Sequence, residues 1–182
     1  MLAFAYDHLD HVLAALILVA RLGDIGTTYL VTPTMQLEAN PIARRLGWPF
    51  AIGTLLVFLV PYFSPEAGVA ILMPSLLVSA SNAGRVWTAR TLGEAEYKAL
   101  LMRVARQSRL SHAIAGVTAS ASFVVLTGLV VLLFYPNPSE DWAFWMGAGI
   151  VGYGVVMGLY GGVAFARLFR EAAMASPRAR AV

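Results

Sequence analysis

The chain has 182 residues, of which 59% are hydrophobic and only 13% are charged, and its mean hydropathy is +0.71. Soluble domains contain roughly a quarter charged residues, so this composition excludes an ordinary soluble domain and indicates a protein embedded in lipid. The formal net charge is +3, and the absence of cysteine excludes disulfides, thiolate metal sites and thiol catalysis.

The first apolar block, residues 12–20, predicts a membrane helix that is retained in the protein. Residues 1–11 contain no Lys or Arg, and Arg21 follows the block without a small-residue cleavage site. A cleaved signal peptide has the opposite pattern, with a positive start and a cleavable end. We therefore expect this helix to be the first membrane span.

Five segments approach the length of about 20 apolar residues that a helix needs to cross a bilayer. They are residues 11–32, 48–63, 69–90, 111–135 and 140–169. The second is the shortest, and Pro61, Pro65 and Pro74 leave open a single kinked or re-entrant element over residues 48–90. We predict an all-α transmembrane bundle of about five spans, with residues 1–182 forming one membrane domain.

The charged residues distinguish the two sides of this bundle. With five spans, all thirteen Lys and Arg residues except Arg21 fall on one side. These are Arg44, Arg45, Arg85, Arg90, Lys98, Arg103, Arg106, Arg109, Arg167, Arg170, Arg178 and Arg180. The other side holds Asp7, Asp10, Glu66, Glu140 and Asp141. Because an excess of Lys and Arg marks the cytoplasmic face, we predict an outside N-terminus, a cytoplasmic C-terminus and a location in the inner (cytoplasmic) membrane.

Residues 94–109 predict an additional helix on the cytoplasmic side. Tyr97, Leu100, Leu101 and Val104 recur at intervals of three and four, while the basic side chains fall largely outside that stripe. A basic amphipathic helix of this kind lies at the membrane surface and binds anionic lipid headgroups. The alternative is a solvated connector between two spans.

Arg21 and Asp24 lie near the middle of the first span and share one helical face with Thr28. A charge at the centre of a bilayer costs about 3 kcal/mol or more, so these side chains must face protein or water and have partners. One interpretation is an ion pair that only orients helices. The other is a site for an ion, a proton or a polar ligand.

Residues 36–41, just after the first span, read Gln-Leu-Glu-Ala-Asn-Pro. Asn40 followed by Pro41 is typical of a helix start, with Asn as the N-cap and Pro at the first helical position. Capping does not explain Glu38, which together with Asp24 would supply the oxygen ligands that Mg²⁺ and Ca²⁺ prefer. Asp24 and Glu38 are therefore candidate ligands of a divalent cation.

The run of Asp24, Thr27-Thr28 and Glu38-Ala39-Asn40-Pro41 resembles small, uncharacterised integral-membrane families of prokaryotes. Those families pair an Asp…Thr pattern in a helix with Glu-x-Asn-Pro just after it. The resemblance covers residues 22–46 and implies that they form one local unit. It implies no activity, and the spacer over residues 31–36 lacks the glycine that the pattern would have before the Glu.

The third predicted span places Ser75, Ser79 and Asn82 on one face, with Arg85 a turn further on. Such groups commonly join membrane helices by hydrogen bonds worth about 1 kcal/mol each. In the predicted topology, however, Asn82 and Arg85 share the cytoplasmic half of the bundle with Asp24, which favours a pocket open to the cytoplasm. The candidate ligand-binding residues are Arg21, Asp24, Thr28, Glu38, Asn82 and Arg85.

Gly154, Gly158 and Gly162 recur at intervals of four in the fifth predicted span. Small residues with this spacing let helices approach closely, within one chain or across a dimer. Five spans are also few for a complete transport pathway. We therefore predict a homo-oligomer or a subunit of a larger complex.

Three functions fit this pattern. The first is a small transporter or channel-like protein whose inner polar site binds a cation, a proton or a small polar solute. The alternatives are a non-catalytic accessory or scaffold subunit, and a membrane-embedded metal-dependent enzyme acting on a lipid or isoprenoid. The sequence has no HExxH, Walker-type loop, GxSxG or dinucleotide fingerprint. We expect membrane lipids, and no nucleic acid, as partners.

Overall fold

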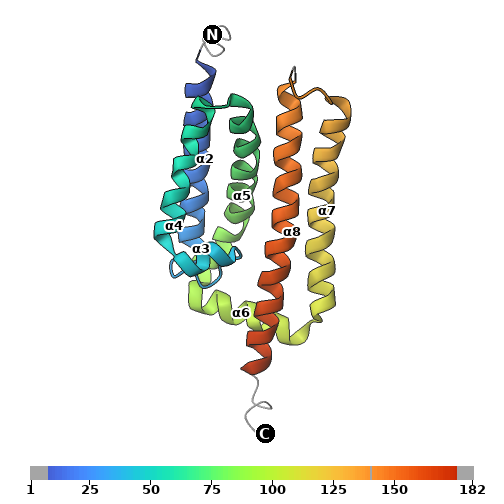
Figure 1. Cartoon of the computed structure of the whole chain (residues 1–182). Coiled ribbons are helices and arrows are strands. Elements are labelled where there is room, and N and C mark those ends of the chain that lie inside the picture. Colours follow the sequence, from blue (N-terminus) through green and yellow to red (C-terminus); the bar gives the residue numbers. More distant parts are fainter. Residues whose placement is uncertain (1–7, 140, 176–182) are drawn as a thin grey trace.

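The computed structural model describes residues 8–139 and 141–175, and every regular element in them is a helix (Figure 1). The predicted all-α fold class is thus confirmed. Four helices are long and apolar enough to cross a membrane, as expected of a polytopic membrane protein. They are α2 (Leu9–Val31), α5 (Pro65–Leu92), α7 (Leu110–Phe134) and α8 (Trp142–Met174).

Four shorter helices complete the described fold: α3 (Pro41–Leu46), α4 (Trp48–Gly53), η1 (Thr54–Tyr62) and α6 (Glu94–Gln107). The predicted second span corresponds to α4 and η1, and η1 is a 3₁₀ helix. A 3₁₀ helix rises about 2.0 Å per residue, so α4 and η1 together extend roughly 27 Å, close to the thickness of a bilayer core. The segment is therefore longer than its residue number suggests.

The chain reverses between η1 and α5, so residues 48–90 do not form a single kinked element. Ser64 caps α5 by accepting a hydrogen bond from the Ala67 N–H at 3.1 Å, and Pro65 occupies the first turn, where its missing N–H costs nothing. This cap starts α5 earlier than the predicted residue 69. Pro74 is accommodated inside the helix.

Helices α2, α5 and α8 run in one direction along the bundle, and α7 runs in the opposite direction (Figure 1). The segment of α4 and η1 runs beside α2 from one end of the bundle to the other, in the direction of α7. Helices α3 and α6 lie at the same end as the C-terminal part of α8, which we call the basic end. Its described Lys and Arg residues are Arg44, Arg45, Arg85, Arg90, Lys98, Arg103, Arg106, Arg109, Arg167 and Arg170. The opposite end holds Asp10, Glu66 and Asp141. Asp7, Glu140, Arg178 and Arg180 lie outside the described residues.

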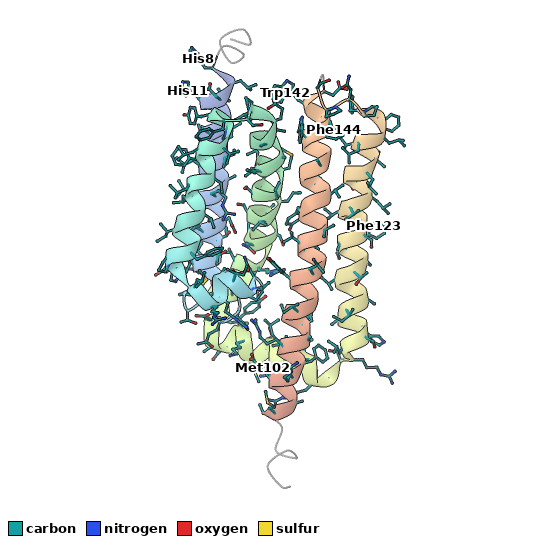
Figure 2. All side chains as sticks on the ribbon, viewed as in Figure 1. His8, His11, Met102, Phe123, Trp142 and Phe144 are labelled. Atoms are coloured by element: carbon teal, nitrogen blue, oxygen red, sulfur yellow. The ribbon has the colours of Figure 1, made fainter. Side chains whose placement is uncertain are left out.

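The apolar side chains divide between a small core and a large outer surface. Leu13 and Ile17 of α2 pack with Val69 and Leu72 of α5, and Ile17 is completely buried. On α7, Phe123 is 70% exposed and points away from the bundle (Figure 2). A surface of this kind suits lipid rather than water, which agrees with the membrane assignment.

The fold contains two local structures that the sequence predicts. The Asn40 side chain caps α3 by accepting hydrogen bonds from the N–H groups of Ile42 (2.9 Å) and Ala43 (3.4 Å), as predicted. The expected surface helix over residues 94–109 is α6, which packs against α8 and α5. That it binds anionic headgroups stays a prediction.

Helices α7 and α8 approach closely at glycines. A methyl group on Gly154 would lie 2.7 Å from Val125 Cγ2, and one on Gly158 would lie 3.1 Å from Ala121 Cβ. At Gly162 the nearest such atom, Ile114 Cδ1, is 3.9 Å away. Gly154 and Gly158 therefore allow α7 and α8 to pack closely within the chain. This is one of the two arrangements that their spacing predicts.

Candidate functional site

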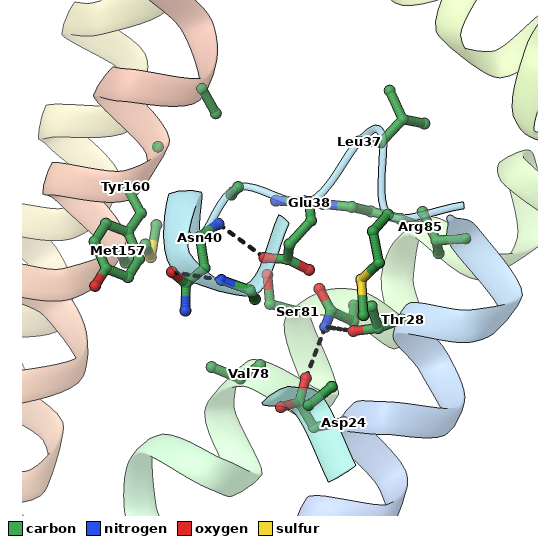
Figure 3. A pocket seen from close by; sticks show the side chains of 18 of the residues that line it. Asp24, Thr28, Leu37, Glu38, Asn40, Val78, Ser81, Arg85, Met157 and Tyr160 are labelled. Atoms are coloured by element: carbon green, nitrogen blue, oxygen red, sulfur yellow. Dashed lines mark hydrogen bonds between the residues drawn. The ribbon is translucent and has the colours of Figure 1, made fainter. Parts of the chain in front are cut away.

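A cavity of about 620 Å³ lies towards the basic end, between the α2–α5 pair and α8. Its lining also includes residues of the loop over residues 32–40, of α4 and of η1. All six candidate ligand-binding residues predicted from the sequence line it: Arg21, Asp24, Thr28, Glu38, Asn82 and Arg85. Several of them converge in the close view (Figure 3). The volume is within the range of about 300–1,000 Å³ that is typical of small-molecule sites.

A network of hydrogen bonds around Asp24 joins α2 to α5. Arg21 Nη1 donates to Asp24 Oδ2 at 2.8 Å, and both side chains are largely buried. Asn82 Nδ2 donates to Asp24 Oδ1 at 3.0 Å and to Thr28 Oγ1 at 3.1 Å (Figure 3). Both carboxylate oxygens of Asp24 therefore have donors, which is what a charge at membrane depth requires.

The Arg21 guanidinium extends this network to a third helix. Its Nη2 donates to Thr54 Oγ1 at the start of η1, whereas its buried Nε has no hydrogen-bond partner among the described residues. Sequence reasoning did not select Thr54, because a single Thr in an apolar segment is most simply explained by a bond to its own backbone. Thr54 Oγ1 does make such a bond, to the Ala51 carbonyl at 2.6 Å.

Glu38 reaches the cavity from the 32–40 loop. Its Oε1 accepts a hydrogen bond from the Asn40 N–H at 2.8 Å, and it makes no ion pair in the described part of the chain. Burial raises the pKa of Glu38, and the negative charge of Asp24 raises it further, against the opposing effects of the Asn40 N–H and of Arg85. Glu38 is thus a carboxyl group that its surroundings stabilise only weakly as an anion.

Glu94, the first residue of α6, fixes the start of the 32–40 loop. It accepts hydrogen bonds from Thr32 Oγ1 (2.5 Å), Thr34 Oγ1 (2.8 Å) and the Thr34 N–H (3.2 Å). Burial raises the pKa of Glu94, but the combined hydrogen bonds outweigh that effect and the net pKa is lowered. In the sequence, Glu94 is indistinguishable from an acidic residue that complements a helix N-terminus.

Arg167 of α8 holds the other end of this loop. Its guanidinium donates to the carbonyl oxygens of Glu38 (3.3 Å) and Gln36 (3.4 Å), and its Nε lies 3.8 Å from Glu171. Lys98 of α6 adds a hydrogen bond to Gln36 Oε1 at 3.2 Å. The sequence assigns Arg167 only to the cytoplasmic charge excess, and Lys98 to that excess and to the basic face of the helix over residues 94–109, because nothing in the sequence links them to residues 36–38.

Apart from Arg167, the wall of the cavity formed by α8 is apolar and aromatic. Met157 and Tyr160 lie opposite the Asp24 network (Figure 3), and the same helix contributes Tyr153, Ala164 and Phe165. Tyr153 makes one long hydrogen bond, from its hydroxyl to the Leu77 carbonyl at 3.5 Å. The glycine pattern of this helix had drawn attention to its other face, where it packs on α7.

Arg85 extends from α5 into the same cavity and is exposed. Its guanidinium makes no hydrogen bond to the described residues, although its charge acts on Glu38. An arginine with five donors and no fixed acceptor is able to bind an incoming anionic or polar group.

The divalent-cation hypothesis places Asp24 and Glu38 at one site, and both do line the same cavity. Within residues 8–139 and 141–175, no cluster of three or more His, Cys, Asp or Glu side chains has metal-binding geometry. Both oxygens of Asp24 are engaged by Arg21 and Asn82, with which a cation would have to compete. The hypothesis stays a prediction.

The arrangement is chemically suited to binding. It combines charged donors and acceptors on one wall with an apolar opposite wall, in a volume that admits a small molecule. Fold alone would not identify the ligand, since one fold serves many functions. The chain matches no protein-family model, no curated protein and no solved structure.

Proposed function

We propose that this chain is a five-span protein of the inner (cytoplasmic) membrane, with its basic end in the cytoplasm, and that its cavity binds a small polar solute that it helps to transport. Four spans are the long helices, and the fifth is α4 with η1. Its length of roughly 27 Å supports this assignment. The concentration of Lys and Arg at one end supports the orientation.

The observation that carries the proposal is the joining of Arg21, Asp24, Thr28 and Asn82 beside an open volume. Charged side chains are expensive in a membrane and usually mark a pathway or a binding site. If the network served only to hold α2 against α5, close packing around it would suffice. Instead it borders a cavity of about 620 Å³ that also receives Glu38 and Arg85.

The proposal includes self-association. Five helices surround too little volume for a complete pathway across the membrane, so transport would require a homo-oligomer or a partner subunit. An open groove between α7 and α8, lined by Ser122, Leu126 and Leu159 among others, is compatible with such contacts.

The absence of cysteine makes accessibility a direct test. Ser81 lines the cavity, and Ser120 is an exposed residue of α7 that faces outward at a similar distance from the basic end. A membrane-impermeant thiol reagent should label Ser81→Cys rapidly in inverted vesicles and Ser120→Cys hardly at all, because only the cavity admits water. Equally slow labelling of both would favour a scaffold with a closed interior.

A third single cysteine tests the orientation. Ser108 is an exposed residue at the end of α6. The reagent should label Ser108→Cys in inverted vesicles and leave it unmodified in intact cells. Labelling in intact cells would place the basic end outside and overturn the proposed topology.

A further inference from the structure

The two walls of the cavity differ in chemistry. The wall formed by α2, α5 and the 32–40 loop carries most of the charged and polar groups, Arg21, Asp24, Glu38, Asn82 and Arg85, beside apolar residues such as Ile25 and Val78. The α8 wall, from Tyr153 to Phe165, extends roughly 18 Å along the helix axis and contributes mainly apolar and aromatic groups. A fully polar solute would leave this second wall without a favourable contact, whereas a molecule with an apolar chain would cover it.

The charged groups that line the cavity also carry a net positive charge. Arg21 and Asp24 neutralise each other in an ion pair. Arg85 and Arg167 then face one remaining carboxyl group, Glu38. Arg167 already donates to backbone carbonyls and lies 3.8 Å from Glu171, whereas the exposed Arg85 guanidinium makes no hydrogen bond or ion pair to the described residues. A negative group beside Arg85 would gain a charge-assisted hydrogen bond, while a positive group would meet an excess of guanidinium charge.

The volume of the cavity also indicates a ligand larger than a bare ion. A bare cation or a proton needs a small fraction of 620 Å³. The cavity instead has the volume of sites for molecules with many non-hydrogen atoms. Its ionic wall and its apolar wall lie opposite each other in Figure 3, so one molecule can contact both.

From these three observations we infer that the ligand is an amphiphile with an anionic head group, a phosphate or a carboxylate, bound by Arg85 at the ionic wall, and with an apolar chain lying along α8 between Tyr153 and Phe165. This inference rests on the proposed function, because it needs the cavity to be accessible from the cytoplasm. It narrows the proposed solute to one whose polar part is an anionic head group and which also carries an apolar chain.

The test uses protection of Ser81→Cys in the full chain, reconstituted in phosphatidylcholine nanodiscs. Octyl phosphate serves as the amphiphilic anion. Inorganic phosphate tests the head group alone, octyl glucoside tests the chain with a neutral head, and octyltrimethylammonium tests a cationic head. Octyl phosphate should slow labelling of Ser81→Cys at concentrations at which the other three probes leave it unchanged.

Two arginines of α5 provide a matched pair of variants. Arg85 lines the cavity, whereas Arg90 is exposed near the end of the helix and does not line it. Arg85→Gln should raise the concentration of octyl phosphate needed for half-protection about tenfold, since it removes one charge-assisted hydrogen bond. Arg90→Gln should leave that concentration unchanged. The labelling rate without ligand shows whether each variant keeps the cavity intact.

The outcomes separate the inference from the function on which it rests. Equal protection by inorganic phosphate would mean a site for free phosphate. Stronger protection by octyltrimethylammonium would mean that the site prefers a cationic head group to an anionic one. If Ser81→Cys is labelled but no probe slows the labelling, the inference of an amphiphilic ligand is wrong, while the proposal of an accessible cavity is supported. If Ser81→Cys is not labelled at all, the proposed function fails as well.

Discussion

The helix pairs α2–α5 and α7–α8 are held together in different ways. Between α2 and α5, side chains form hydrogen bonds at membrane depth, from Asn82 to Asp24 and Thr28 and from Ser79 Oγ to the Ala20 carbonyl at 2.7 Å. Between α7 and α8, glycines bring the backbones together. A methyl group on Gly128 would lie 2.7 Å from the Gly147 carbonyl oxygen.

The difference explains where the cavity lies. Close packing of glycines leaves no room between two helices, because backbone atoms occupy the space that side chains would take. Hydrogen bonds between long polar side chains fix two helices at a few points and leave volume beside them. The α2–α5 pair, which we call the polar pair, therefore borders the cavity. The α7–α8 pair, which we call the glycine pair, supports α8 as the opposite wall of the cavity.

The largest expected effect tests the polar pair. Arg21→Gln and Asp24→Asn should each lower the free energy of unfolding by about 3 kcal/mol, because each leaves the partner charge uncompensated at membrane depth. The variant with both substitutions should recover a large part of that loss. Unfolding in mixed micelles with increasing dodecyl sulfate measures all four proteins of this double-mutant cycle.

Simple additivity of the two losses would contradict the description of Arg21 and Asp24 as a coupled pair. It would assign their stability to separate partners, Thr54 for Arg21 and Asn82 for Asp24. The α2–α5 contact would then resemble an ordinary polar interface rather than a compensated charge.

The next effect tests the glycine pair. Gly128→Ala should lower the free energy of unfolding by about 2 kcal/mol, because the new methyl group would meet backbone atoms of α8 that cannot move separately. Gly116→Ala is the matched control on the same helix, since no atom outside its own helix lies within 4 Å of the added methyl group. The control should be neutral or stabilising by up to about 1 kcal/mol through helix propensity. A similar loss in both variants would mean that glycine acts through propensity and not through close approach.

The sequence alone predicts the helices and the presence of a polar site. Hydropathy located all four long helices, and the cost of charge in a membrane selected Arg21 and Asp24. The 3₁₀ geometry of η1 was not predictable, since its residues have the composition of any apolar helix. Nor were the bonds that place the 32–40 loop, because Glu94 and Arg167 are distant in the chain from the residues they contact. Such contacts follow from the packing of α6 and α8, which no local pattern records.

The smallest expected effect depends on pH and uses two glutamates of opposite behaviour, both outside the four long apolar helices. The raised pKa of Glu38 means that the folded protein binds this proton more tightly than the unfolded chain. Its contribution to the free energy of unfolding is therefore largest in acid and declines as the pH rises from the ordinary glutamate pKa through the raised one. Glu38→Gln should remove that decline and make the protein slightly more stable than the parent at neutral pH.

Glu94→Gln should act in the opposite sense. The lowered pKa of Glu94 provides stability above the ordinary glutamate range that is lost as the pH falls through the lowered value, so this variant should be less stable at neutral pH and approach the parent in acid. Unfolding of both variants from about pH 4 to about pH 8 measures the two differences. Because burial outweighs the hydrogen bonds at Glu38, whereas the combined hydrogen bonds outweigh burial at Glu94, differences of the same sign would contradict this account of the 32–40 loop. Glu38 would then not belong with the charged side chains that distinguish the α2–α5 side of the bundle from the α7–α8 side.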